Sequence, residues 1–398
     1  MNKKFMAVAL LLAACFMVFA NGTQESSEKV VLTVWESAQG PDEFIKQAGA
    51  AFTAKYPNIE INYVNVESND ASSQIALDGP AGVGADIFCA QHDQIGKLVT
   101  SGHVLPVANP SKIKKSLLDA CIQGATYEGT MYGYPVSAET YAVYYNKDLI
   151  SEKELPKTWD DLAKWCAEFT KKNPGKQGLV MDVGNAYYSI IFASAKGNRL
   201  FGKSGTDFSS SYLTTKEAVE GMKVFQNLKK VGLDVPAADM TGSIVDASFT
   251  SGIAAMAISG PWNIENYAKA GINYGVAPLP AMPGEKTPSA SFSGVRCMFV
   301  SAYTDYPEEA ALFAEFLVSD EMQQLRYEIT AALPSVDMKL DDPIALGFLK
   351  QLDYAYPMRT GPQMDKYWEV FGAASSNIWN GADVETELAA ADASIIGK

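Results

Sequence analysis

Histidine is almost absent from this chain, with only His92 and His103 among 398 residues. Neither belongs to a His-Glu-x-x-His helix, and no calcium loop of alternating acids around a central glycine occurs, so we expect no metal and no cofactor. A Gly-x-Ser-x-Gly nucleophile elbow is also missing. A glycoside hydrolase needs only two carboxylates, so this enzymatic alternative stays open.

Basic residues are scarce as well. Lysine and arginine total 32 against 46 aspartate and glutamate residues, which gives a formal charge of −14. Such a charge repels phosphate backbones and anionic lipid surfaces, so we expect no nucleic-acid partner. An apolar fraction of 47% is enough to build sizeable cores, and a length of 398 residues indicates two lobes or domains.

Long hydrophobic runs are missing, with one exception at the N-terminus. Lys3 and Lys4 precede an apolar run over residues 5–20. This run of about sixteen residues is shorter than the roughly twenty of a membrane-spanning helix, and it ends in small or modest side chains. We therefore predict a signal peptide over residues 1–20, cleavage after Ala20, and an exported, periplasmic product.

A second interpretation concerns the cysteine inside this run. Residues 12–15, Leu-Ala-Ala-Cys, resemble the lipobox of bacterial lipoproteins, in which the cysteine is acylated and tethers the protein to the membrane. Apolar residues follow Cys15, whereas an acylated cysteine is usually followed by a polar tether, so cleavage after Ala20 is favoured. In a third interpretation, Cys15 is one more apolar residue of the run.

The remaining cysteines are Cys89, Cys121, Cys166 and Cys297. They form no Cys-x-x-Cys pair, and their separations do not suggest a zinc site. Cys89 and Cys166 stand in apolar surroundings, so most of these thiols are expected to be free and buried. Export also permits disulfides, and three full pairings stay open.

Strand and helix patterns alternate along the first hundred residues. Residues 30–35, 59–63 and 86–90 have the β-branched or alternating character of strands, and Pro41 opens a helical pattern between the first two. Further helices are predicted over 159–169 and 215–230 and from residue 307, with short strands near 254–258 and 274–278. This alternation predicts an α/β fold with mainly parallel sheets covered by helices.

Residues 197–204, Gly-Asn-Arg-Leu-Phe-Gly-Lys-Ser, satisfy the phosphate-loop pattern literally. A phosphate loop needs a buried strand before it and a helix after it. Residues 187–194 suit a helix equally well, and residues 205–210 suit a loop. We therefore do not expect nucleotide binding.

Several segments resemble, in the same order, the extracellular maltose-binding proteins of bacterial ABC importers. The first is Gly-Ala-Asp-Ile-Phe-Cys-Ala-Gln-His-Asp at residues 84–93. The others lie at residues 127–139, 145–149, 156–162, 260–262, 273–280 and 361–364, followed by Trp368. Together they cover most of the chain from residue 30 to residue 368, and their order and spacing are specific.

The resemblance implies a two-lobed periplasmic-binding-protein clamp in which the chain crosses between the lobes more than once. We expect residues 29–138 plus 291–342 to form lobe 1 and residues 139–290 plus 343–398 to form lobe 2. It further implies a monomeric receptor rather than an enzyme, which binds a di- or oligosaccharide of the maltose type and delivers it to an ABC permease. An exported glycoside hydrolase that uses Asp93 and Glu139 is one alternative, and a receptor of the same fold for a non-sugar solute is another.

Six ligand-binding residues are predicted, five of them from matches to the family: Asp93, Glu139, Tyr187, Trp262, Trp368 and, from the first strand end, Glu36. Carboxylates and aromatic faces suit a sugar, because it presents hydroxyl groups and patches of C–H. Each residue also has a structural alternative. Asp93 suits a helix cap, the other two acids a solvated loop or strand end, and the aromatic residues ordinary packing.

The chain departs from the maltose binders at positions that bear on the ligand. Ala90 stands where they carry a tryptophan, Ala38 and Gln39 stand where they carry an acid and a lysine, and Gln94 replaces an arginine. These differences leave fewer aromatic platforms, and they favour a different or shorter saccharide than maltodextrin.

Overall fold

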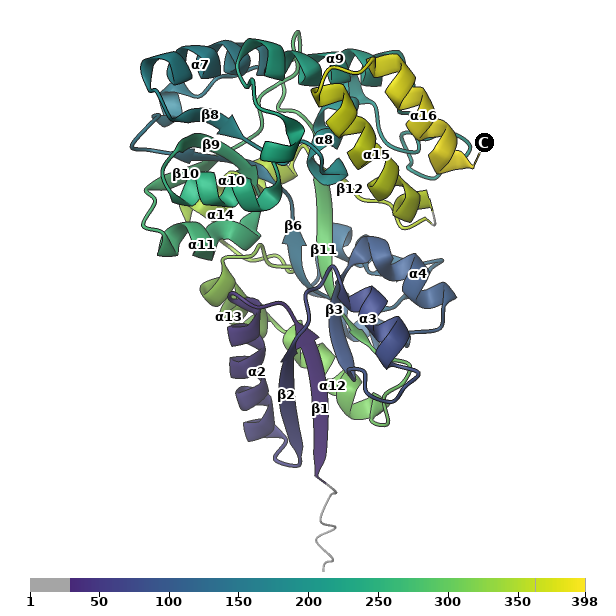
Figure 1. Cartoon of the computed structure of the whole chain (residues 1–398). Helices are drawn as coiled ribbons and strands as arrows, with labels where there is room; N and C mark the ends of the chain where they lie inside the picture. The colour runs from purple at the N-terminus through teal and green to yellow at the C-terminus, as the bar shows by residue number, and fades with distance from the viewer. Residues whose placement is uncertain (1–28, 362, 398) are drawn as a thin grey trace, which may run out of the picture.

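Two β-sheets, one in each of two lobes, organise the chain in the computed structural model, which describes residues 29–361 and 363–397 (Figure 1). The larger sheet has the order β12-β11-β3-β1-β2, with β6 paired to β11. Its strands are β1 (Val30–Glu36), β2 (Ile59–Asn65), β3 (Ile87–Gln91), β6 (Gly133–Glu139), β11 (Phe292–Val300) and β12 (Tyr356–Pro357). The smaller sheet, β10-β7-β9-β8, consists of β7 (Ala142–Asn146), β8 (Gln177–Val180), β9 (Ala254–Ser259) and β10 (Tyr274–Ala277).

Helices pack around both sheets, and the lobes are named here after the sheet that each contains. The larger-sheet lobe carries α2 (Pro41–Lys55), α3 (Ala71–Asp78), α4 (Ile95–Thr100), α5 (Pro110–Ile113), α6 (Asp119–Gly124), α12 (Pro307–Leu317) and α13 (Asp320–Thr330), and the hairpin β4 (Thr126–Tyr127) and β5 (Thr130–Met131). The smaller-sheet lobe carries α7 (Trp159–Lys172), α8 (Ala186–Ala193), α9 (Lys216–Val231), α10 (Gly242–Thr250), α11 (Ile264–Lys269), α14 (Pro343–Leu352), α15 (Gln363–Trp379) and α16 (Val384–Ile396). Single turns are η1 (His92–Gln94), η2 (Glu152–Glu154), η3 (Ala195–Gly197), η4 (Ala237–Asp239) and η5 (Pro261–Asn263).

The predicted α/β periplasmic-binding-protein fold is confirmed, but both sheets are mixed. In the larger sheet β1 pairs in parallel with β2 and β3, whereas β11 is antiparallel to β3 and β6. In the smaller sheet β9 is parallel to β8 and antiparallel to β7, which is antiparallel to β10. The expectation of mainly parallel sheets therefore needs correction for the smaller sheet. β7 and β9 are buried at every residue, so their sequences show the continuous buried character typical of parallel strands although they pair antiparallel.

The strands β6 and β11 run side by side from one lobe towards the other (Figure 1). Glu139, the last residue of β6, lies opposite Gly294 of β11. The predicted lobe boundary between residues 138 and 139 thus falls at the end of β6. The division into residues 29–138 plus 291–342 and 139–290 plus 343–398 stays a prediction.

Local signals in the sequence set several helix ends. Pro41 occupies the first turn of α2, where its missing N–H costs no hydrogen bond. The side chains of Thr158 and Thr215 cap α7 and α9 by accepting hydrogen bonds from the Asp161 and Ala218 amides. The helix expected from residue 307 is α12, which ends at Leu317, and a separate helix, α13, begins after the chain is extended at Ser319.

The phosphate-loop pattern lies in irregular chain between α8 and α9. Lys196 and Phe201 adopt left-handed conformations, with φ of 52° and 56°. The segment follows α8 and the η3 turn rather than a strand, and α9 begins only at Lys216. The context that phosphate binding requires is therefore absent from this segment.

The four cysteines of the described chain are buried free thiols, as expected for core residues. Burial raises the pKa of Cys89 and of Cys121 to about 12, which keeps both protonated at neutral pH. The predicted signal peptide and Cys15 lie outside the described residues. Among the helices that the structure describes, none combines the length and the apolar character needed to span a bilayer.

Candidate functional site

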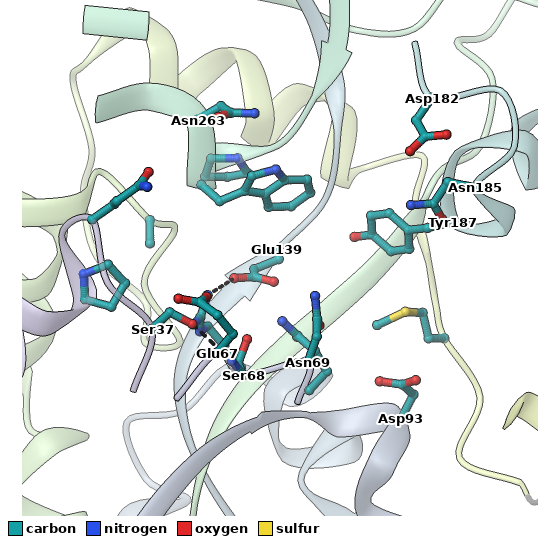
Figure 2. Close-up of a pocket in the computed structure, with 18 of the residues that line it drawn as sticks. Ser37, Glu67, Ser68, Asn69, Asp93, Glu139, Asp182, Asn185, Tyr187 and Asn263 are labelled. Carbon is teal, nitrogen blue, oxygen red and sulfur yellow. Dashed lines mark hydrogen bonds and ion pairs between the residues drawn. The ribbon is translucent and has the colours of Figure 1, made fainter. Parts of the chain in front are cut away.

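A cleft of about 940 Å³ lies between the lobes and is lined by residues of both (Figure 2). Five of the six predicted site residues line it, namely Asp93, Glu139, Tyr187, Trp262 and Trp368. They come from segments separated by up to 275 residues. The sixth residue, Glu36, is not among the lining residues.

The aromatic residues of the cleft lie around Tyr187. Its ring centroid is 6.2 Å from that of Trp262 and 6.4 Å from that of Trp368. Trp262 is 38% exposed, in the η5 turn, which presents its indole to the cleft. A Cβ on Gly260 would lie 2.1 Å from this indole, so the glycine is required for the ring to fold back over the strand end. The Trp262 indole is thereby available to a ligand, and Trp368 also lines the cleft.

Asp93 lies on the larger-sheet side of the cleft, in the η1 turn after β3. The indole Nε1 of Trp368 and the amide Nε2 of Gln94 donate hydrogen bonds to its Oδ2, at 3.1 and 3.2 Å. Burial raises the pKa of Asp93, and His92, Gln94 and Trp368 offset this only in part. The carboxylate makes no capping hydrogen bond to α4, so the helix-cap alternative is not supported.

His92 fixes the position of this turn and has no face in the cleft. The Val295 amide donates to its Nδ1 at 3.0 Å, and its Nε2 lies 3.1 Å from the Met358 carbonyl. Because Nδ1 accepts from an N–H and Nε2 must donate to a carbonyl, the ring is the neutral Nε2–H tautomer. Burial, the main cause, lowers the pKa of His92 and favours the same neutral form.

The structure places Glu36 beneath the cleft, where it is fully buried. Arg296 Nη2 lies 2.7 Å from Glu36 Oε1, and Arg326 Nη1 lies 3.4 Å from Oε2. Burial opposes ionisation of Glu36, but the two guanidinium groups outweigh it and the pKa is lowered. The expected direct contact of Glu36 with the ligand therefore has no geometric support, because its oxygens are taken by the two arginines.

Arg296 connects this buried ion pair to the cleft. Its Nη1 lies 3.7 Å from Glu139 Oε1, while its Nη2 also donates to Ser37 Oγ at 2.7 Å. Glu139 is only 7% exposed and Figure 2 shows it in the middle of the lining residues. This burial excludes the alternative of a solvated loop acid. Next to it, the larger-sheet lobe contributes the polar side chains of Ser37, Glu67, Ser68 and Asn69.

The smaller-sheet lobe contributes acids and amides that the sequence analysis missed. Asp182 Oδ2 accepts from the Gly242 amide at 2.9 Å, and Asp246 Oδ1 accepts from Asn263 Nδ2 at 2.7 Å. Asn185 caps α8 by accepting from the Tyr187 amide at 2.9 Å and also lines the cleft. The Asn-Ala-Tyr sequence after a strand could have indicated this cap. Nothing local marks Asp182 or Asp246.

These groups suit the binding of a polyhydroxylated solute. Aromatic faces, amides and carboxylates from both lobes converge on one cavity, and such a set fixes hydroxyl groups and stacks against C–H surfaces. No cluster of three or more His, Cys, Asp or Glu that could hold a metal ion occurs in residues 29–361 and 363–397.

Comparisons with known proteins agree with this geometry. A family described as bacterial extracellular solute-binding protein matches residues 36–324. The galactooligosaccharide-binding protein and the maltodextrin-binding protein MdxE of Bacillus subtilis (strain 168) are each 33% identical, over 94% and 92% of this chain and 90% of their own length. The crystal structure of a cyclo/maltodextrin-binding protein complexed with maltotetraose superposes with a TM-score of 0.79 at 32% identity, over 94% of this chain and 98% of that one. The chain thus belongs to the family of bacterial extracellular solute-binding proteins, which are non-catalytic receptors.

Proposed function

We propose that this protein is the extracytoplasmic receptor of an ABC importer and that it binds an oligosaccharide between its two lobes. The observation that carries the proposal is the convergence of Trp262, Tyr187 and Trp368 with the acids Asp93 and Glu139 on one cleft. The two Bacillus relatives support it, since one is named for galactooligosaccharides and the other for maltodextrins.

The size of the cleft favours an oligosaccharide. Its volume of about 940 Å³ lies near the upper end of the ~300–1,000 Å³ that small-molecule sites usually occupy. Both maltodextrins and galactooligosaccharides remain candidates. A ligand of the maltose type is favoured, because the aromatic residues match positions of the maltose-binding proteins. Ala90, Gln39 and Gln94 replace side chains of the maltose binders, which leaves room for a different linkage or a shorter chain.

Delivery to the importer would follow from closure of the lobes. A ligand that contacts both lobes binds the closed state more tightly, and only such a difference in affinity shifts the equilibrium between open and closed forms. The closed, loaded receptor would then dock on the permease. After cleavage at Ala20 the receptor would diffuse freely outside the cytoplasm, whereas acylation at Cys15 would retain it at the outer face of the membrane.

Titration calorimetry with a panel of solutes tests the proposal. Maltotriose, maltotetraose and galactooligosaccharides are compared with monosaccharides, an amino acid and a short peptide, and we expect heat with at least one oligosaccharide. Heat with the peptide or amino acid alone would instead favour the receptor for a non-sugar solute. Chromatography of the sugar after prolonged incubation separates the receptor from a glycoside hydrolase, because a receptor returns it intact.

A further inference from the structure

Carboxylates dominate the charged side chains that line the cleft. The acids are Glu67, Asp93, Glu139, Asp182, Asp246 and Glu265. Among the described residues that line it, the cations are Arg296 and Arg326, and no lysine is present. Both guanidinium groups are already paired with the buried carboxylate of Glu36, at 2.7 and 3.4 Å. Lys269, which does not line the cleft, pairs with Glu265 at 2.5 Å, and the remaining acids leave the cleft with an excess of negative charge towards a ligand.

This excess is greatest on the smaller-sheet side. Neither Asp182 nor Asp246 has a lysine or arginine nitrogen within 4.0 Å in the described parts of the chain. Neutral donors satisfy them instead, among them the Gly242 amide for Asp182 and the Tyr267 hydroxyl at 2.9 Å for Asp246. Burial is the main cause that raises the pKa of each carboxyl group, which is the response of an acid without a cation.

Unpartnered buried atoms of the cleft-lining residues include one donor, Arg326 Nε, and two acceptors that bear on the charge of the ligand. Gln91 Oε1 and Glu265 Oε2 are buried, line the cleft and have no hydrogen-bond partner. Both are acceptors, so each is satisfied by a donor on the ligand. Hydroxyl and ammonium groups supply such donors, whereas a carboxylate, sulfate or phosphate group supplies none.

We propose that the cleft selects saccharides by charge, admitting neutral and amine-bearing sugars and rejecting acidic ones, and that Asp182 and Asp246 determine this selectivity. The inference deepens the proposed function and rests on it. An anionic sugar would be brought next to carboxylates in a partly desolvated space without a free arginine to pair with, and such like-charge contacts are a means of excluding wrong ligands. A protonated amine at the same position finds carboxylate acceptors.

The test compares derivatives of one trimer, the neutral galactotriose or maltotriose that binds better. The C6 hydroxyl groups are replaced by carboxylates, by amines, or by uncharged carboxamides that reproduce the shape of the carboxylate. By calorimetry we expect the carboxylate derivative to bind at least tenfold more weakly than the carboxamide, and the amine at least as tightly as the carboxamide. Equal affinities of carboxylate and carboxamide would overturn the proposal, since shape would then decide.

A double variant, Asp182→Asn with Asp246→Asn, assigns the effect to these residues. We expect it to reduce the carboxamide-to-carboxylate affinity ratio at least fivefold, whereas the exposed pair Asp239→Asn with Asp305→Asn removes the same charge outside the cleft and leaves the ratio unchanged. Raising the salt concentration must also shrink the parent's ratio, because salt screens charges but not shape. An unaltered ratio in the cleft variant would overturn the assignment.

The two proposals fail in different ways. If the acidic trimer binds and the neutral one does not, the charge selectivity is wrong while a sugar receptor survives. If no saccharide binds at all, the proposed function is wrong, and the inference built on it fails as well.

Discussion

The acid beneath the cleft, Glu36, and the acids on the smaller-sheet wall, Asp182 and Asp246, have pKa values shifted in opposite directions. Glu36 is fully buried, yet its pKa is lowered, because Arg296 and Arg326 outweigh the cost of burial. Asp182 and Asp246 are less buried, yet their pKa values are raised, because burial outweighs the neutral hydrogen-bond donors that reach them and no cation of the described chain is near. The protein itself neutralises the first acid and leaves the other two to be compensated by what binds.

This difference assigns distinct roles to the two regions. Glu36 ends β1, Arg296 belongs to β11 and Arg326 to α13, so one cluster joins three elements of the larger-sheet lobe. Arg296 extends the cluster to Glu139, at the end of the strand that leads into the other lobe. We infer that the cluster holds the floor of the cleft in place before a ligand binds, whereas the acids of the smaller-sheet wall interact with the ligand itself.

The largest effect is expected from breaking the buried cluster. Glu36→Gln leaves two arginines buried without their carboxylate, and removing one partner of a buried ion pair typically costs about 3–5 kcal/mol. Urea denaturation measures the free energy of unfolding, with Glu60→Gln, which removes an exposed acid paired to Lys29, as the matched control. A loss below about 1 kcal/mol would show that the arginines find other partners and that the cluster does not hold the floor.

Removing the exposed indole sharpens the comparison, because it affects binding rather than stability. Trp262→Ala is expected to weaken the best oligosaccharide at least tenfold, about 1.4 kcal/mol, through the loss of a stacking face. Calorimetry measures the affinity, and thermal unfolding checks that the fold is retained. Tyr354→Ala serves as control, because Tyr354 is comparably exposed, at 36%, and does not line the cleft. An unchanged affinity would remove Trp262 from the binding site.

The pH dependence of stability is expected to have opposite signs in the two regions. The Glu36 contribution is present above its ordinary pKa of 4.5 and is lost as the pH falls through the lowered value in the folded protein. The raised pKa of Asp246 makes its contribution present below the ordinary 3.8 and lost as the pH rises through the higher folded value.

Two isosteric substitutions, Glu36→Gln and Asp246→Asn, test these opposite pH dependences of stability. Glu36→Gln should be most destabilised at neutral pH, with the deficit shrinking below pH 4.5. Asp246→Asn should be at least as stable as the parent at pH 7, since the amide oxygen can still accept from Asn263 and Tyr267, and this advantage should vanish in acid. Melting temperatures between pH 3 and pH 8 check both, and equal signs for the two variants would contradict the contrast between the regions.

Local patterns predicted much of the fold, and the family resemblance named five residues that line the cleft, whose role in ligand binding stays a prediction. The starts of α7 and α9 could be predicted at Thr158 and Thr215, because a capping side chain binds an amide only three residues away in the sequence. The role of Glu36 was misjudged, because its partners Arg296 and Arg326 are 260 and 290 residues distant and no local signal links them. Asp182 and Asp246 escaped notice for the same reason, since only folding brings their loops to one cavity.

The smallest effect is expected where charges meet across the lobes in solvent. Lys97 Nζ in α4 lies 3.9 Å from Asp365 Oδ2 in α15, and the two side chains are 47% and 57% exposed. Exposed pairs contribute about 0–1 kcal/mol, so Lys97→Met should change oligosaccharide affinity by less than about threefold. Calorimetry at low and high salt checks this, because the small difference should disappear when the pair is screened. A change in affinity above tenfold that persists at high salt would mean that lobe closure depends on this contact between α4 and α15. The contrast between the buried cluster and the ligand-facing wall would then no longer account for binding.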